Sequence, residues 1–378
     1  MKQRILTAER DYGMLVQYLR ESGEKRVFLV CGRSIDAMPI QACFASLPRW
    51  AGIEVVRFSG FQPNPDYQSV VEGVRAFRES RSGMIVAVGG GSAMDVAKCI
   101  KLWCRLDPGQ SYLEQEPAPN DVKLLAVPTT AGSGSEATQF AVIYSQGRKQ
   151  SIASEACLPS AVLFDPSVLD TLPAYPKRAA MLDALCHGVE SFWSVHATPE
   201  SKEYARRAIQ SLLAHYRGYL EGERQSGAEM LQAAHLAGRA IHITQTTAGH
   251  AMCYGLTSRY GLAHGHGAAL CVAALWPYML EHLEDCVDPR GSAYLEGVFQ
   301  ELAAAVGCAE AHQAARRFQA LLDELELSPP QVGEGDPAVL AEQAAPERLR
   351  NHPVRLERTT IQGLYHKILR IQPQEERC

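Results

Sequence analysis

Short apolar runs alternate with segments of helical periodicity in the first half of the chain. The runs, each five or six residues with few charges, span 26–31, 53–58, 84–88 and 123–128. Apolar residues recur at helical spacing between them, over 67–78 and 93–106. Runs of this length predict buried strands, and their alternation with helices predicts parallel βαβ units in a doubly wound sheet.

The pattern changes near residue 170. Clustered prolines (Pro166, Pro173 and Pro176) interrupt the chain, and most of the sequence beyond them is rich in Ala, Leu, Glu and Arg at helical spacing. We therefore predict an α/β domain over residues 1–170 and an all-helical domain over 171–378. The length of 378 residues agrees with two domains.

Composition and charge exclude several classes of protein. A chain with 46% hydrophobic and 21% charged residues is neither disordered nor fibrous, and a net charge of −5 gives no reason to expect a nucleic-acid partner. There is no apolar run long enough for a membrane span, and the first residues do not resemble a signal peptide. The eleven cysteines form no CxxC pair, which favours free thiols in a reducing cytoplasm. We expect a cytoplasmic homodimer.

Two loops rich in glycine and hydroxyl groups come directly after strand-like runs. Gly89-Gly90-Gly91-Ser92 precedes a helical segment, so its free N–H groups and the helix dipole suit a phosphate. Asp95, in the first turn of that helix, suits the dipole but not a nearby anion; a tight turn is the alternative. The loop 128–136 (PTTAGSGSE) suits a pyrophosphate, ribose or nicotinamide, with a flexible surface loop as the alternative. Ligands of open α/β sheets bind at such strand ends.

Four side chains in the second half form a candidate metal site. Asp183 and His187 are four residues apart in a helical pattern, which places them on one face. A metal or a helix-surface hydrogen bond would satisfy such a pair. His250 and His264 would be about 21 Å apart on a straight helix, but glycines between them let the chain fold back. Together the four predict a three-histidine, one-carboxylate site for a divalent ion, with His266 as an alternate ligand or a loop residue.

These motifs together resemble the iron-dependent (group III) alcohol dehydrogenases. The similar segments are GGGSAMDVAK, PTTAGSGSE, AMLDALCH and the stretch from GHAMCY to GLAHGHG, spread over about residues 25–285. The resemblance implies a dinucleotide-binding α/β domain, a helical domain, and a cleft between them that holds a metal and NAD(P). It also implies that Asp183, His187, His250 and His264 are the metal ligands.

The resemblance assigns residues of the first half to the cofactor. Gly90 and its neighbours would take the pyrophosphate, and Thr129 and its neighbours would lie near the phosphates and the nicotinamide. The full expected set is Gly32, Arg33, Ser34, Gly90, Gly91, Ser92, Asp95, Thr129, Thr130, Ser133, Ser135 and Lys149.

Two positions depart from the family pattern. Tyr254 stands where members often carry another histidine, so we expect the proton to come from water or through Tyr254, with His250 and His264 completing the catalytic group. Gly32-Arg33-Ser34 stands where NAD-selective members tend to have an aspartate. Gly32 removes the carboxylate that would repel a 2′-phosphate, and Arg33 can pair with that phosphate. We therefore predict that NADPH is preferred and NADH is accepted.

The implied reaction is the reversible reduction of a small aldehyde to its primary alcohol. Fe(II), or Zn(II) with the same ligands, would act as a Lewis acid on the carbonyl oxygen while hydride passes from the nicotinamide. A general short-chain alcohol dehydrogenase is one alternative. A metal-dependent lyase similar to dehydroquinate synthase is the other.

The segment 190–202 and the stretch HAMCYGLT are similar to the phosphonoacetaldehyde reductase branch. We therefore expect an anionic aldehyde, with sulfoacetaldehyde and succinic semialdehyde as competitors. The candidate substrate residues are Arg148, Phe140, Trp193 and Arg259, and Lys149 is a further cation. The alternatives are that the cations are surface or cofactor-facing charges and that Trp193 is helix core.

Overall fold

The computed structural model describes residues 3–8, 11–117, 120–331 and 335–370. It divides into a first unit, Met1–Pro173 with Glu221–Gly238, and a second unit, Ala174–Leu220 with Arg239–Cys378. The sequence pattern predicts 221–238 in the helical domain. The structure instead packs that segment on the first unit, where a Cβ on Gly238 would lie 2.4 Å from Gly134 O. Such close backbone contact is open only to glycine.

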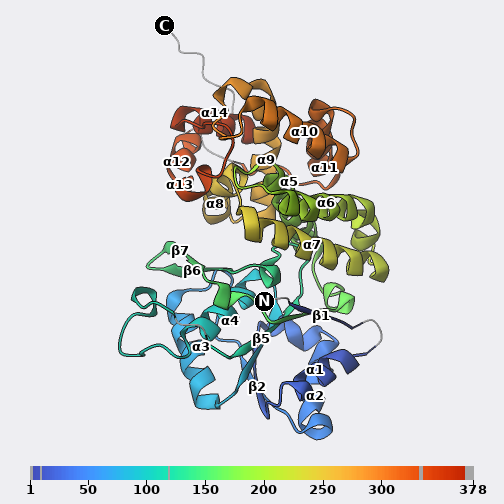
Figure 1. Cartoon of the computed structure of the whole chain (residues 1–378), viewed down its shortest axis with the longest axis vertical. Helices are drawn as coiled ribbons and strands as arrows, with labels where there is room; N and C mark the ends of the chain where they lie inside the picture. The colour runs from blue at the N-terminus through green and yellow to red at the C-terminus, as the bar shows by residue number, and fades with distance from the viewer. Residues whose placement is uncertain (1–2, 9–10, 118–119, 332–334, 371–378) are drawn as a thin grey trace. The chain divides into compact units, whose positions relative to one another are not determined.

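The first unit is built on six parallel strands. The order across the sheet is β1-β8-β5-β4-β2-β3, and Figure 1 shows the strands between helices. Their bounds are β1 (Arg4–Thr7), β2 (Arg26–Cys31), β3 (Glu54–Phe58), β4 (Met84–Gly89), β5 (Lys123–Pro128) and β8 (Ala161–Phe164). A separate antiparallel hairpin pairs β6 (Phe140–Ser145) with β7 (Arg148–Ala153). The predicted doubly wound sheet is confirmed.

Helices cover both faces of this sheet. Along β2, Val27, Leu29 and Cys31 pack with α1 (Gly13–Glu21) and α2 (Ile40–Ala51). The alternate residues Phe28 and Val30 pack with α3 (Tyr67–Ser80) and α4 (Gly91–Trp103) on the other face. Both sides of the strand are therefore buried, which explains why these strands read as continuous apolar runs.

The strand order changes direction between β2 and β4. β2 and β4 are neighbours, but the chain leaves β2 toward α2 on one face and leaves β4 toward α4 on the other. Such a switch point is where open α/β sheets bind ligands. Gly32 and Gly90, which come after these two strands, therefore flank the expected cofactor position.

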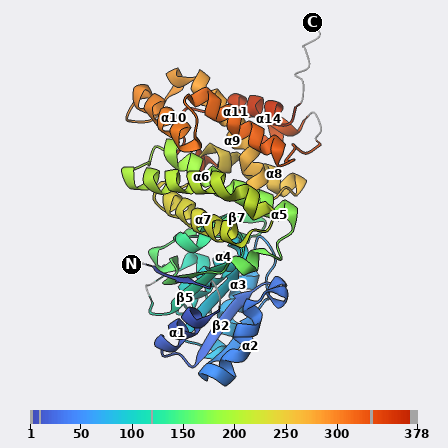
Figure 2. The same ribbon diagram turned by 90° about the vertical axis from the view of Figure 1, so that its right-hand side faces the viewer.

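The second unit is helical in its described residues. α5 packs against α6 and α9, and α8 packs along α9 (Figure 2). The bounds are α5 (Ala174–Trp193), α6 (Pro199–Leu220), α8 (Ala248–Tyr260), α9 (His264–Glu281), α10 (Ser292–Val306), α11 (Ala311–Glu324), α12 (Asp336–Glu342), α13 (Pro346–Leu349) and α14 (Arg358–Ile368). α7 (Arg224–Thr244) is divided between the units, with Gly238 the last of its residues in the first unit. Among the described helices, none is both long and apolar enough to cross a membrane.

Candidate functional site

Three of the four expected ligands meet inside the second unit. Asp183 and His187 lie one turn apart on α5, and His250 comes from the first turn of α8. All three are buried, and one ligand atom from each lies within 4.8 Å of the others. The imidazoles of His187 and His250 stack with their centroids 4.6 Å apart. Two of these side chains therefore come from one face of α5, and the third comes from the start of α8.

His264 stands at the edge of this cluster. It is the first residue of α9, and its Nε2 lies 4.0 Å from Asp183 Oδ1. Its side chain is 41% exposed. Gly261, with a φ of 67°, ends α8 in the left-handed conformation, which lets the chain reverse and return His264 toward α5. The fold-back expected from the glycines is therefore present.

Two buried atoms of the cluster fit a metal ion. Asp183 Oδ1 and His250 Nε2 face one another at 3.4 Å, and neither has an aligned hydrogen-bond partner. Two ligands of a tetrahedral ion at about 2.1 Å would be separated by roughly 3.4 Å. Buried polar atoms without partners are costly, and a divalent cation between them removes that cost. Carboxylate oxygen and imidazole nitrogen suit Fe(II) and Zn(II) alike.

The charges of the cluster stabilise an ionised carboxylate. Burial alone would raise the pKa of Asp183, but the nearby His187, His264 and His250 outweigh burial and hold that pKa well below its usual range. Burial would likewise lower the pKa of His250, yet the carboxylates of Glu190 and Asp183 raise it to about 9. The carboxylates of Asp183 and Glu190 therefore favour a cation at the centre of the site.

Glu190 is a residue of the candidate site that the sequence analysis missed. It is fully buried on α5, and its Oε2 contacts His250 Nδ1. Its Oε1 accepts hydrogen bonds from Thr247 N (3.0 Å), Thr247 Oγ1 (2.6 Å) and Gly249 N (3.0 Å). These contacts hold the pKa of Glu190 at about 2 against the opposing effect of burial. The available signal was its spacing, seven residues after Asp183 and three after His187.

The contact with Glu190 orients His250. A carboxylate at Nδ1 favours retention of the proton there, so Nε2, which faces Asp183, is the nitrogen that would bind a metal in place of its proton. Carboxylate–histidine–metal arrangements of this kind fix ring orientation in metalloproteins.

Cys253, Tyr254 and His266 surround the cluster without joining its three central ligands. Cys253 Sγ lies 3.5 Å from His264 Nδ1, and Tyr254 stacks on His264 with ring centroids 5.6 Å apart. His266 is buried in α9, and its Nδ1 bonds the hydroxyl of Tyr175 at 3.1 Å. His266 is therefore engaged away from the three central ligands. Among the described residues, the metal-like cluster contains Asp183, His187 and His250 and no cysteine.

Gly265 allows α9 to approach α5 at the position of the metal ligands. A Cβ at residue 265 would lie 2.1 Å from Ala179 O and 2.6 Å from Asp183 Cβ. No real side chain tolerates such contacts, so α9 can reach this depth only with glycine there.

Replacing Gly265 by alanine should therefore destabilise the protein by about 1–3 kcal/mol, the usual cost of overpacking. It should also weaken metal binding, because His264 would move away from Asp183. Gly297→Ala in α10 is the matched control, since a Cβ there meets nothing within 4 Å; it should be neutral or stabilise slightly. Thermal unfolding and metal titration measure both effects, and equal behaviour of the two variants would contradict the expectation.

The two glycine-rich loops lie side by side in the first unit. Gly90 precedes α4 in extended conformation, and Thr129 N donates to Gly89 O at 3.0 Å. A Cβ on Gly90 would contact Thr130 at 3.4 Å, and one on Gly91 would contact Ser133 at 3.6 Å. Backbone donors at the start of α4 and the hydroxyls of the second loop therefore share one surface at the strand ends.

Ser135 and Asp95 are used inside the protein. Ser135 Oγ donates to Asp95 Oδ1 at 3.0 Å and accepts from the buried Lys98 Nζ at 2.9 Å. Lys98 also donates to Thr138 Oγ1 and to Phe140 O. Burial lowers the pKa of Lys98, and the nearby Asp95 opposes that shift. These contacts fix the second loop, and they engage the Ser135 hydroxyl and both carboxylate oxygens of Asp95 within the protein.

The remaining expected cofactor residues lie at the strand ends or in the hairpin. Arg33 and Ser34 are exposed in the short 3-10 helix Arg33–Ala37 after β2. Ser92 Oγ accepts from Asn64 N at 3.3 Å. Lys149 lies in β7, opposite Tyr144. Burial raises the pKa of Asp95, and the charge of Lys149 is one of several effects that oppose this shift.

The expected substrate residues lie in different units. Phe140 and the exposed Arg148 belong to the β6–β7 hairpin of the first unit. In the second unit, Arg259 Nη2 donates to Asp336 Oδ1 at 2.6 Å. Trp193 is fully buried and donates from Nε1 to Thr247 Oγ1 at 2.9 Å. Trp193 therefore supports the segment before His250.

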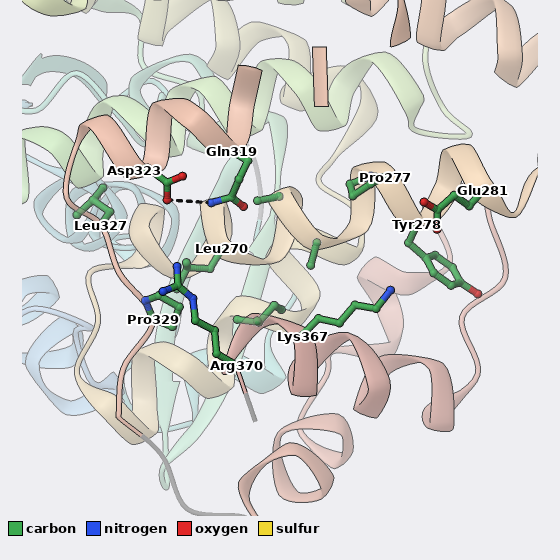
Figure 3. A pocket seen from close by; sticks show the side chains of 13 residues that line it. Leu270, Pro277, Tyr278, Glu281, Gln319, Asp323, Leu327, Pro329, Lys367 and Arg370 are labelled. Carbon is green, nitrogen blue, oxygen red and sulfur yellow. Dashed lines mark hydrogen bonds between the residues drawn. The ribbon is translucent and has the colours of Figure 1, made fainter. Parts of the chain in front are cut away.

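Figure 3 shows a cavity in the second unit between α9, α11 and α14. Its volume is about 260 Å³. Lys367 and Tyr278 line it, and Gln319 Nε2 donates to Asp323 Oδ1 at 3.2 Å on its wall. None of its lining residues belongs to the expected metal, cofactor or substrate sets.

Known proteins with similar sequences and folds include aldehyde reductases. Phosphonoacetaldehyde reductase of Streptomyces viridochromogenes is 35% identical over 311 residues, 78% of each chain. The solved iron-containing alcohol dehydrogenase of Thermococcus thioreducens superposes with a TM-score of 0.86 at 24% identity, covering 98% of this chain and 99% of that one. Sulfoacetaldehyde reductase of Bifidobacterium kashiwanohense, solved with NAD⁺, gives 0.86 at 23% identity and 98% coverage of both chains. These two structures share the fold.

Family models match nearly the whole chain. The model described as iron-containing alcohol dehydrogenase matches residues 3–166. The model of the C-terminal part of the Fe-containing alcohol dehydrogenase family matches residues 177–369. The resemblance inferred from the motifs is confirmed, and the chain belongs to the iron-containing alcohol dehydrogenases, a family of oxidoreductases.

Proposed function

We propose that this protein reduces a small anionic aldehyde to its primary alcohol, with NADPH as the preferred reductant. The proposal includes a divalent ion, Fe(II) or Zn(II), held by Asp183, His187, His250 and His264. The observation that carries it is the 35% identity to a phosphonoacetaldehyde reductase over 78% of both chains. The buried group of Asp183, His187 and His250 supports the metal requirement.

The protein's own groups position the reactants. When bound, the divalent ion polarises a carbonyl oxygen as a Lewis acid and the reduced nicotinamide supplies the hydride. Asp183 and His250 would hold the ion, and the contact of Glu190 with Nδ1 would keep the His250 imidazole in the tautomer that binds it. The donors after β4 and β5 bind the cofactor's phosphates. The burial of Asp183, His187 and His250 would limit the access of water to the ion from their side.

A panel of aldehydes tests the substrate class. With metal-loaded protein and NADPH, kcat/KM for phosphonoacetaldehyde should exceed that for the uncharged propanal by about tenfold or more, because charge-assisted hydrogen bonds to an anion are worth about 1.5–3 kcal/mol. Sulfoacetaldehyde and succinic semialdehyde separate phosphonate recognition from recognition of any anion. A preference for propanal would favour the short-chain alcohol dehydrogenase. Absence of net NADPH consumption with every aldehyde would favour the lyase.

Comparison of kcat/KM with NADPH and with NADH tests the cofactor preference. Gly32 carries no carboxylate to repel a 2′-phosphate, and Arg33 is exposed beside it. We therefore expect a higher kcat/KM with NADPH than with NADH, and a strong preference for NADH would refute this part of the proposal.

Tyr254→Phe tests the proton donor. Tyr254 stacks on His264 at the edge of the cluster, and general acid catalysis typically contributes about 10²–10⁴-fold. If Tyr254 donates the proton, kcat should fall within that range while metal content stays the same. Tyr278→Phe is the control, because Tyr278 stacks on His282 at the other end of α9. Unchanged kcat in Tyr254→Phe would assign the proton to water.

A further inference from the structure

A charged pair lies at the carboxyl ends of β2 and β3. Arg57 donates from Nη1 to Asp36 Oδ1 at 2.5 Å and from Nη2 to Asp36 Oδ2 at 3.2 Å. Nη2 also reaches Gly32 O at 3.3 Å, and Nε donates to Ser59 Oγ at 3.0 Å. Four contacts therefore hold the guanidinium beside Gly32, the first residue after β2.

The pair lies where a dinucleotide would place its adenosine ribose. The pyrophosphate is expected at the start of α4, after β4, and β2 and then β3 lie next to β4 across the sheet. Neighbouring strands are about 4.8 Å apart, so the end of β3 is about 10 Å from the end of β4. This separation suits the nucleoside part of a dinucleotide whose phosphates lie at the switch point.

Asp36 has the chemistry that ordinarily selects NAD. A carboxylate near the end of the second strand binds the ribose hydroxyls and repels a 2′-phosphate. Here Arg57 neutralises that carboxylate through a two-point contact, and this contact holds the pKa of Asp36 below its usual range. The carboxylate is ionised, yet its charge is balanced by an arginine that the solvent can reach, with 35% of its side chain exposed.

We propose that Asp36 and Arg57 together select the cofactor at its adenosine 2′ position. Arg57 cancels the repulsion of Asp36 and, with the exposed Arg33, provides the positive charge that a 2′-phosphate requires. Asp36 in turn keeps the guanidinium in place. This inference rests on the proposed NADPH-linked function. It adds the residues that recognise the substituent at the adenosine 2′ position.

Binding of cofactor fragments to the full-length protein tests the proposal without the chemical step. Adenosine 2′,5′-bisphosphate and adenosine 5′-monophosphate differ only in the 2′-phosphate, and calorimetry gives both dissociation constants. Arg57→Met should weaken binding of the bisphosphate by about tenfold or more, because it removes the cation and leaves Asp36 unpaired. The monophosphate should bind as before or more tightly. Asp36→Asn should tighten binding of the bisphosphate, because it removes a negative charge.

The amino ends of the same two strands carry a matched control. Arg26 Nε donates to Glu54 Oε2 at 2.6 Å, and the two side chains are 37% and 62% exposed, close to the 35% and 56% of Arg57 and Asp36. Arg26→Met should leave the affinity for both nucleotides unchanged. Loss of affinity for both nucleotides in Arg57→Met, or for neither, would overturn the proposal.

Failure of this inference is distinguishable from failure of the proposed function. Fragment binding needs neither the metal nor an aldehyde. A protein that reduces aldehydes but shows no Arg57-dependent preference for the bisphosphate keeps its function and refutes the inference. A protein that shows this preference and reduces no aldehyde supports the inference and refutes the function.

Discussion

Replacing His250 by alanine should abolish metal binding and, with it, the reduction of aldehydes. His250 is buried, and its Nε2 faces Asp183 Oδ1 at 3.4 Å. Alanine removes this donor and also leaves the buried Glu190 without its imidazole partner. Loss of an outer partner alone typically lowers metal affinity 10–100-fold. Loss of a ligand should therefore lower it by more than about 100-fold, measured as metal content after dialysis and by metal titration.

His312→Ala is the control for this variant, because His312 is exposed on α11. It should retain the metal and the activity of the unmodified protein. Far-ultraviolet circular dichroism separates loss of the metal from loss of the fold in His250→Ala. Full metal content and full activity in a folded His250→Ala protein would show that the proposed ligand set is wrong.

Replacing Glu190 by glutamine should lower metal affinity by about 10–100-fold, the range seen when the hydrogen-bond partner of a ligating histidine is lost. Both carboxylate oxygens of Glu190 accept hydrogen bonds, one from Thr247 and Gly249 and the other at His250 Nδ1. A glutamine must place its NH₂ against one of these sets of donors. That conflict should also lower the free energy of unfolding by about 1–3 kcal/mol.

Glu301→Gln provides the comparison for an ordinary glutamate. Glu301 pairs with Lys202 at 2.9 Å and is 55% exposed, so its loss should cost less than about 1 kcal/mol and leave metal affinity unchanged. Metal titration and thermal unfolding of the two variants give the contrast. Unchanged metal affinity in Glu190→Gln would mean that the His250 ring is oriented by its helix alone.

The sequence predicted four of the six sheet strands, and three of these are buried on both faces. The runs 26–31 and 123–128 coincide with β2 (Arg26–Cys31) and β5 (Lys123–Pro128). β1 escaped prediction because it has four residues and an exposed Ile5. The β6–β7 hairpin escaped because its pattern is mixed, with only alternate residues of β6 buried. Burial on both faces favours a continuous apolar run, but β3 was predicted although it is only partly buried, and the fully buried, four-residue β8 was missed.

Motifs and helical periodicity were enough to identify the family, the doubly wound sheet and the pairing of Asp183 with His187, because they are local properties of the chain. The folded structure was needed to bring His250 to α5, to give Glu190 its partner and to pack 221–238 on the first unit. It was also needed to place Arg57 beside Gly32. Each of these depends on contact between segments far apart in the chain, permitted by glycines such as Gly265 and Gly238. Such contacts depend on how whole elements pack, which local spacing does not encode.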